Sequence, residues 1–508
     1  MYIALMVIAG SIAVDLLWTA MKPLWRRTTA RTALAGALLF LVVTSSAYLL
    51  ASTPRVFTIV LLVISLYRAL NYTRIALGRM NHHALRAYAR RSILWLDGAQ
   101  LLVLGCWLLW EYTGGLSVEL LYGTWAAGAL LISVFVFGST LRNLRRTKIR
   151  TDDAQREHLT TSTLPTITVA IPARNETNNL ITCLESVVSS EYPKLEILAL
   201  DDSSHTKRTP EIIRSFAHKG VRFLQGDNPR DGWLAKNQAY DTLAGQANGE
   251  YLLFMGVDIE LAPESIRALV DHLHNRGKKM LSVMPLRYIK QQSKGLSLSQ
   301  AARYMWELAP PRRLFQRPPV LSSVWLIEKR AFLELGGMAA VKRSVTPEAY
   351  FARMLAKSDA YGFVRSNKAL GVTSHKSLAD QRDTAIRVRY PALHKHIEFV
   401  ALLTLGYCLV LLGPLALVVG SLLGELSIYV GILGLTSLTL FGLAFTLVVT
   451  ATRLSPAWLA MPAFPFAVLR DIAITHASLW GYEFGSVTWK QRNTVEQVME
   501  VSKHLPKI

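Results

Sequence analysis

The sequence predicts an α/β domain inserted between α-helical transmembrane segments. Long apolar segments lie in the first 150 residues and again after residue 395, and several approach the roughly 20 residues that a helix needs to cross a bilayer. Between them, residues 164–261 contain short apolar runs that each end in polar or acidic side chains. Parallel strands deliver side chains to one edge of a sheet in this way, which predicts the α/β domain.

The composition fits a chain that lies partly in lipid. The 508 residues are long enough for a membrane domain and a separate soluble core, and 51% of them are hydrophobic. The net charge of +21 gathers between apolar segments without a nucleic-acid motif, so we expect membrane contact and no nucleic-acid partner. The three cysteines lack paired spacing, which predicts small buried hydrophobic side chains rather than disulfides or a zinc site.

The first predicted domain, residues 1–151, is a membrane domain. Its five apolar segments lie at about 2–20, 33–52, 55–71, 94–111 and 119–140. Basic residues follow the first, third and fifth segments, as at Arg26, Arg79 and Arg145. Since such residues stay on the cytoplasmic side, we expect five crossings of the plasma (inner) membrane with the N-terminus outside.

The second predicted domain covers residues 152–395 and is cytoplasmic, and the third, residues 396–508, returns to the membrane. We expect two spans in the third domain, at about 398–422 and 427–451. Three prolines and several charged residues interrupt residues 456–484. This favours an interfacial helix or a re-entrant pair over a clean span, followed by a cytoplasmic tail.

The soluble domain begins with the pattern of a nucleotide-binding fold. The strand-like run 167–172 leads into Arg174-Asn175-Glu176, and after a helix with one apolar face the run 195–200 ends in Asp201-Asp202. Two further runs, 221–224 and 251–255, are predicted as the third and fourth strands. Strand, helix, strand and acidic tip together predict a ligand crevice at the carboxyl ends of the strands.

Several short motifs carry a family resemblance through their order and spacing. They are Ile171-Pro-Ala-Arg-Asn-Glu176, Asp201-Asp-Ser-Ser204, Gly232-Trp-Leu-Ala-Lys236, the segment from Trp325 to Gly337, and Gly485-Ser-Val-Thr-Trp-Lys-Gln-Arg492. Residues 166–360 thereby resemble family 2 glycosyltransferases with the GT-A (nucleotide-diphospho-sugar transferase) fold. The membrane enzymes that glycosylate hopanoids, carotenoids or diacylglycerols are the most similar subgroup, although Ala235 stands where that subgroup has glycine.

The resemblance implies a binding site for a nucleotide-sugar donor. Asp202 would accept the N3–H of a uracil-type base, and Asp201 would steady the turn or contact ribose. Pro172, Asn175 and Glu176 would line the same pocket, as would Arg174 unless it is only a surface charge. The structural alternative is a pair of turn carboxylates that cap the next helix.

The Gly-Trp loop implies two further donor contacts. Lys236 comes at an expected helix start, where its ammonium and free backbone N–H groups would neutralise a diphosphate. A solvated lysine is the alternative. Trp233 belongs to the same motif, with packing as its alternative role.

The expected cofactor is a divalent cation, Mg²⁺ or Mn²⁺, yet its motif is altered. The family usually has Asp-x-Asp after the fourth strand, whereas this chain has Gly256 in the first place and Asp258 in the second. Asp258 would hold the ion with phosphate oxygens and water, with Glu260 as a substitute ligand and His375 as a third. Alternatively, metal binding is weak or lost, and Lys236 with a nearby arginine carries the charge.

The expected catalytic base is also altered. The family pattern is Glu-Asp before an Ala-Arg-x-Leu helix, and alignment on that helix puts Pro347 and Glu348 in those two places. An inverting transfer needs a base for the acceptor hydroxyl, and Glu348 retains a carboxylate there. The structural alternative is a first-turn glutamate after a Thr346 cap.

A third motif follows the expected base. Residues 386–390 faintly resemble the Gln-Arg-x-Arg-Trp of processive synthases, so Arg387 and Arg389 would clamp a diphosphate product or lie at the lipid headgroups.

The resemblance implies a hexosyltransferase-like enzyme of the cell envelope that transfers a sugar to a lipid or lipid-linked acceptor, with inversion and without processivity. The alternatives are a processive polysaccharide synthase and a degenerate, non-catalytic binding protein, because both altered motifs concern carboxylates.

Overall fold

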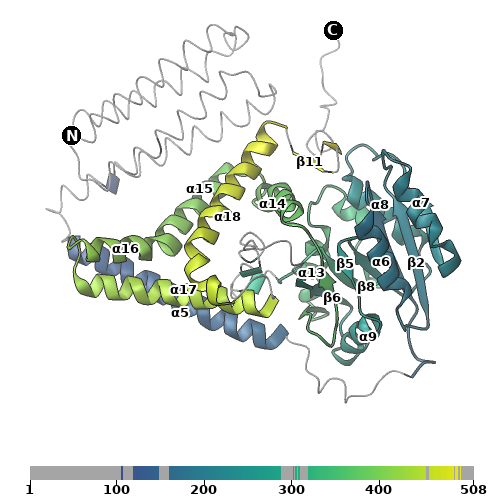
Figure 1. Ribbon diagram of the computed structural model, residues 1–508, viewed down its shortest axis with the longest axis horizontal. Coiled ribbons are helices and arrows are strands. Elements are labelled where there is room, and N and C mark those ends of the chain that lie inside the picture. Colours follow the sequence, from purple (N-terminus) through teal and green to yellow (C-terminus); the bar gives the residue numbers. More distant parts are fainter. Residues whose placement is uncertain are drawn as a thin grey trace, which may run out of the picture.

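The computed structural model describes residues 118–147, 160–287, 318–452 and 457–485, with isolated residues elsewhere (Figure 1). The first four expected apolar segments lie outside these residues, apart from positions 64, 105 and 106. The described chain has an α/β part and a helical part, which lie on opposite sides of the molecule in Figure 1. The division into a soluble domain and membrane domains stays a prediction.

The centre of the α/β part is a sheet of seven strands in the described residues, with the order β3-β2-β1-β4-β8-β6-β9. Its parallel half consists of β1 (Ile167–Ala173), β2 (Leu195–Asp201), β3 (Val221–Gln225) and β4 (Tyr251–Met255). These are the four strands expected from the apolar runs. They pair in register so that β1 and β2 end side by side, with Ala173 opposite Asp201.

The other half of the sheet is mixed. Strand β8 (Val324–Glu328) runs antiparallel to both β4 and β6 (Met280–Met284), and β6 pairs in parallel with β9 (Tyr361–Arg365). A small second sheet joins β5 (Ile259–Glu260), β10 (Thr373–Ser374) and β7 (Leu286–Arg287). It places the chain just after β4 next to the chain just after β10.

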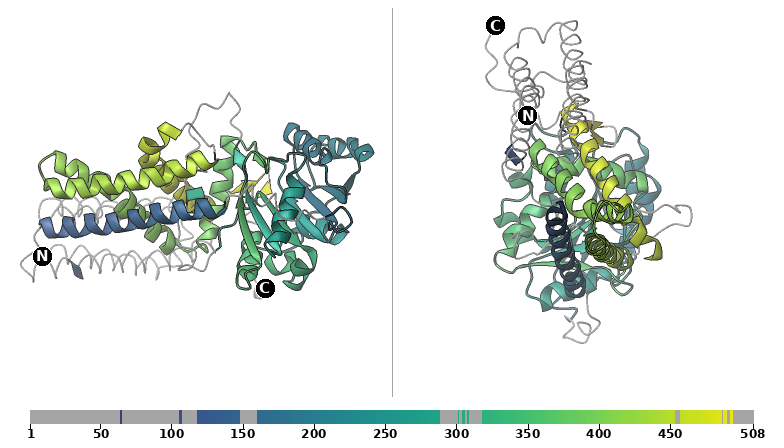
Figure 2. Two further views of the ribbon diagram at one scale, coloured as in Figure 1. Left: turned by 90° about the horizontal axis from the view of Figure 1, so that it is seen from below. Right: turned by 90° about the vertical axis from the view of Figure 1, so that its left-hand side faces the viewer.

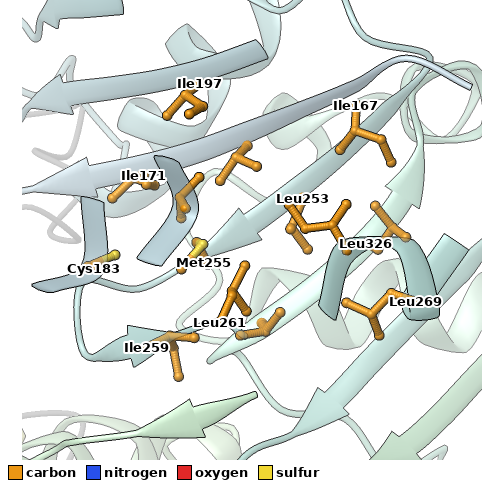
Figure 3. Close-up of a cluster of buried hydrophobic side chains, with 14 of the residues drawn as sticks. Ile167, Ile171, Cys183, Ile197, Leu253, Met255, Ile259, Leu261, Leu269 and Leu326 are labelled. Carbon is orange, nitrogen blue, oxygen red and sulfur yellow. The ribbon is translucent and has the colours of Figure 1, made fainter. Parts of the chain in front are cut away.

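Helices cover both faces of the large sheet, so alternate residues of each strand enter different cores. One core, part of which Figure 3 shows, contains Ile171 and Met255 with α6 (Asn178–Val188), α7 (Arg208–Ser215) and α9 (Ser265–Asn275). The other contains Ala170 and Phe254 with α8 (Ala235–Gln246), α12 (Lys329–Glu334) and α13 (Pro347–Ala356). Burial on both faces explains the continuous apolar runs of the strands.

The helical part contains three helices that are long and apolar enough to cross a membrane, among the described residues. They are Glu119–Thr147, Ile397–Leu422 and Ile428–Thr452. The first belongs to α5 (Val118–Thr147), the third is α17, and the second combines α15 (Ile397–Gly406), a π-helical turn (Tyr407–Leu412) and α16 (Gly413–Leu422). Helix α17 packs against α5 and α16, as Figure 2 also shows.

The proline-containing segment after α17 forms one helix, α18 (Ala460–Glu483). Pro462 lies in its first turn, where backbone N–H groups have no partner within the helix, whereas Pro465 lies inside the helix. The chain therefore does not form the re-entrant pair given as one alternative. An interfacial position for α18 stays a prediction. The helix packs against α17 and against α14 (Leu378–Ala392), the last helix before the membrane part.

Candidate functional site

The acidic turn after β2 is held by backbone and side-chain hydrogen bonds. Asp202 N donates to Ala173 O at 2.8 Å, and Asp201 Oδ2 accepts from Gln225 Nε2 at 3.2 Å and from Ser204 N at 3.4 Å. The two aspartates are 2% and 3% exposed. Asp201 therefore steadies the turn, which is one of the two roles expected for it.

Arg174 shapes the same turn from the end of β1. Its guanidinium donates to Asp202 O at 2.6 Å and Ser203 O at 2.5 Å and lies 3.1 Å from His205 Nε2. With 3% exposure it is not the surface charge considered as an alternative. Ser203 has a φ of 51°, a left-handed conformation that these bonds hold in place.

The loop after β1 interlocks with the loop after β2. Asn175, with a φ of 48°, donates from its backbone N to Ser204 Oγ at 2.9 Å, and its Oδ1 accepts from His205 N at 2.9 Å. Glu176 N donates to Thr209 Oγ1 at 3.0 Å. Pro172, Asn175 and Glu176 keep partial exposure beside the buried aspartates. The residues predicted to contact the base thus form one ordered rim.

The start of α8 is tied to the chain that precedes α13. Leu234 N donates to Lys342 O at 2.9 Å, and Asn237 Nδ2 reaches the carbonyls of Val341, Lys342 and Ser344 at 2.9, 3.2 and 2.8 Å. Asn237 is 1% exposed, so these bonds are shielded from water. They fix the helix that carries Lys236 against the helix that carries Glu348.

Glu348 follows Pro347 in the first turn of α13 and is 1% exposed. The helix start agrees with the structural alternative, although Thr346 makes no side-chain cap. Burial of a carboxylate is costly unless other charges or donors compensate it. The side chains around Glu348 therefore decide whether its buried carboxylate can be charged.

Those surroundings contain charges from distant parts of the chain. Burial lowers the pKa of the Lys236 amine to about 8, while Glu348 and Asp258 act to raise it and Arg387 and Lys376 act to lower it. Each of these side chains must therefore lie close enough to influence the Lys236 ammonium. Glu348, Asp258 and Arg387 thus lie within the range over which their charges act on the Lys236 ammonium.

The structure also tests whether the chain suits a divalent ion at Asp258. Asp258 Oδ2 accepts from Ser374 Oγ at 3.3 Å, and His375 Nε2 lies 3.0 Å from Glu260 Oε2. A Cβ atom on Gly256 would lie 2.7 Å from Asp258 Oδ1. Among the described residues, no group of three or more His, Cys, Asp and Glu side chains is arranged to hold a metal. Asp258 thus offers one carboxylate to a divalent ion, whose remaining ligands would be phosphate oxygens and water.

The comparisons with known proteins concern the domain that contains these residues. Residues 168–335 match the model of Glycosyl transferase family 2. The chain carries a family 2 glycosyltransferase domain. Its mixed α/β sheet is the GT-A-like fold expected from the sequence.

Two curated relatives match part of this chain. Glycosyltransferase AglE of Haloferax volcanii is 36% identical over 102 residues, which cover 19% of this chain and 32% of that protein. A 4,4'-diaponeurosporenoate glycosyltransferase of Staphylococcus haemolyticus is 31% identical over 147 residues, or 28% of this chain and 38% of that protein. The matches span about a third of the length of these relatives.

Solved structures show the same kind of likeness at lower identity. The mannosyltransferase PcManGT of Pyrobaculum calidifontis, in complex with GDP-Man and Mn²⁺, is 16% identical with a TM-score of 0.39, covering 69% of this chain and 99% of that one. TarS of S. aureus, in complex with UDP-GlcNAc, is 13% identical with a TM-score of 0.32, covering 63% and 92%.

The two arginines of α14 have different surroundings in the glycosyltransferase domain. Arg387 acts on the Lys236 ammonium, whereas Arg389 forms an ion pair with Asp471 of α18. The sequence predicted the same role for both arginines. The structure separates them into one arginine beside the charged site and one on the membrane-helix side.

Two other residues differ from their expected surroundings. The Trp233 ring is 8% exposed in the second core, with the Arg230 guanidinium 4.7 Å from its centre, so packing accounts for it and a donor contact stays a prediction. Lys376 was missed by the sequence reasoning. The signal was a basic residue directly after Ser374-His375. The pairing of β10 with β5 brings this segment next to the Asp258 backbone.

Proposed function

We propose that this protein is a membrane glycosyltransferase that moves a sugar from a nucleotide-sugar donor to a lipid or lipid-linked acceptor. The transfer is inverting and adds one sugar at a time. The family 2 domain supports the reaction class, and the lipid-related name of the diaponeurosporenoate relative supports the acceptor class. The three apolar helices support a membrane location.

The observation that carries the proposal is the grouping of Glu348 with cations around Lys236. Buried Glu348 is the base, and the cations face the phosphates of the donor. Asp202 accepts an N–H of the nucleotide base at the other end of the site, where Arg174 and Asp201 keep its turn rigid. The donor is therefore held at both ends, which orients its anomeric carbon toward the base.

The chemical step follows from these positions. The acceptor hydroxyl oxygen attacks the anomeric carbon as the Glu348 carboxylate takes its proton. The bond from that carbon to the phosphate oxygen breaks, and the bonding electrons leave with the nucleoside diphosphate. Lys236, Lys376 and Arg387 stabilise the negative charge that develops on the leaving oxygen. A divalent ion, if one binds, is held by Asp258 and the phosphate oxygens and supplies further charge stabilisation.

We further propose that the domain faces the cytoplasm at the plasma (inner) membrane, with the N-terminus outside. Basic residues after the first, third and fifth apolar segments support this orientation. Helix α14 connects the domain directly to the span Ile397–Leu422, so the site lies near the bilayer from which a lipid acceptor would come.

The proposal is tested with membranes that contain the full chain or its Glu348→Gln variant. Each preparation is incubated with labelled UDP- and GDP-sugars, with Mn²⁺ or with EDTA, and the lipid extract is counted. We expect labelled lipid from the unaltered protein and none from Glu348→Gln. The matched control is Glu334→Gln, because Glu334 is an exposed glutamate on α12 that pairs with Arg330.

The products separate the alternatives. A single added sugar fits the proposal, whereas a ladder of long products would identify a processive synthase. No product and no nucleotide-sugar hydrolysis with any donor would contradict transfer and leave a non-catalytic binding protein. Activity that persists in EDTA would show that the basic side chains of the site suffice to stabilise the leaving diphosphate. Activity lost in EDTA would assign a divalent ion to Asp258.

A further inference from the structure

A buried ion pair joins the glycosyltransferase domain to the membrane helices. Arg389 of α14 pairs with Asp471 Oδ1 of α18, and Asp471 Oδ2 accepts from the Tyr407 hydroxyl at 2.7 Å. Asp471 is 1% exposed. Tyr407 begins the π-helical turn inside the span Ile397–Leu422. One carboxylate thus links α14, α18 and a candidate transmembrane helix.

Further hydrogen bonds hold α18 along the same side of α14. Tyr390 N donates to Ser478 Oγ at 2.9 Å, and the Tyr390 hydroxyl donates to Glu483 Oε1 at 2.7 Å. The Tyr482 hydroxyl donates to the carbonyl of Arg387 at 2.7 Å. These bonds restrict both the rotation of α14 about its axis and its shift along that axis relative to α18.

The geometry of a helix turns this restriction into an effect on the site. Arg387 and Arg389 are two residues apart, and an α-helix turns by about 100° per residue, so their side chains leave nearly opposite sides. Arg389 points to α18, and Arg387 lies near Lys236 and the other charges of the site. A rotation of α14 that freed Arg389 would also move Arg387 relative to the charges around Lys236.

We propose that Asp471 is a positioning residue: by holding Arg389 it completes the contacts that fix the rotation of α14, and so keeps Arg387 directed at the donor diphosphate. The inference rests on the proposed function. A buried ion pair contributes little net stability compared with apolar packing, but it selects one arrangement over others. That property suits a contact that must orient a neighbouring side chain rather than only hold two helices together.

Nucleotide binding to the purified full chain tests the inference. UDP with UMP, and GDP with GMP, are compared by calorimetry for Asp471→Asn, Arg387→Gln and the double variant. We expect each single change to weaken diphosphate binding about tenfold, which is the size of one charge-assisted contact. Monophosphate binding should weaken less than twofold. Because Asp471 acts through Arg387, the double variant should bind the diphosphate no more weakly than Arg387→Gln alone.

The outcomes distinguish this inference from the proposed function. If the losses multiply to about a hundredfold in the double variant, or if the monophosphate weakens equally, Asp471 has only a general structural role. If the unaltered chain binds no nucleotide, the proposed function fails and the inference with it.

Two further variants guard against misfolding. Asp471→Glu keeps the charge and should recover most of the diphosphate affinity, and failure to recover it in a folded protein would contradict the inference. Arg470→Gln changes the charge of an exposed neighbour on α18 and should leave both affinities unchanged.

Discussion

At the tips of β1 and β2 the charged side chains hydrogen-bond directly to the surrounding loops. At the starts of α8 and α13, hydrogen bonds hold the helices, and the charged side chains that they carry act on one another. The first region, the nucleobase end, relies on Arg174 and Asp201 in the loops that follow β1 and β2. The second, the transfer end, combines Lys236 and Glu348 with charges from β10 and α14. A rigid end suits recognition of an unchanging base. An end that combines several positive side chains suits the departure of a negatively charged product.

The largest effect should come from removing the catalytic base, Glu348, at the transfer end. Glu348→Gln keeps the size of the side chain but cannot take a proton at neutral pH. We expect transfer to fall by about 100- to 10,000-fold, the usual contribution of a general base, while nucleotide affinity changes little. Initial rates of lipid labelling and calorimetry with UDP and GDP measure the two. A tenfold loss or less would remove Glu348 from its proposed role.

The next largest effect should come from a substitution at the nucleobase end. Arg174→Met leaves the buried carbonyls of Asp202 and Ser203 without their donor, which we expect to lower the free energy of unfolding by about 3 kcal/mol. Nucleoside mono- and diphosphates should weaken together, in contrast to changes at the transfer end. Denaturant unfolding of the membrane-extracted protein and nucleotide titration measure this. Arg214→Met, at an exposed arginine of α7, is the control and should change neither.

A smaller effect should come from the link between α8 and α13. Asn237→Ala removes the donor shared by three carbonyls and should lower the free energy of unfolding by about 2 kcal/mol. Transfer should fall about tenfold, because Glu348 is no longer fixed relative to Lys236. Asn248→Ala, at an asparagine bonded to Glu196 on the far side of the domain, should leave the transfer rate unaltered. Equal loss of rate in both variants would contradict the proposed link.

The smallest effect should appear in the pH dependence of diphosphate binding. Burial lowers the pKa of Lys236 to about 8, so the free protein loses this positive charge as the pH rises through that value. A bound diphosphate favours the charged lysine, so affinity should be constant below about pH 7 and fall by up to about tenfold per pH unit above 8. Lys236→Arg, which stays charged, should bind with no such fall. The same fall in both proteins would assign it to another group.

The contrast between the two ends also explains how far the sequence could lead. The four parallel strands and the Asp201-Asp202 turn were predictable, because a strand and the loop that follows it are neighbours in sequence. The antiparallel β8 was not, since its apolar run does not reveal strand direction. Lys376 and the divided roles of Arg387 and Arg389 depend on pairing of β10 with β5 and on packing of α14 against α18. Such long-range contacts leave no local pattern.

The most direct test of the account is the position of a nucleoside diphosphate bound to the full chain, determined by cryo-electron microscopy in lipid nanodiscs. The account predicts the base against Asp202 and the diphosphate beside Lys236 and Arg387, with Glu348 facing the position of the sugar. A nucleotide bound elsewhere, or a diphosphate that extends away from Lys236 and Glu348, would contradict it.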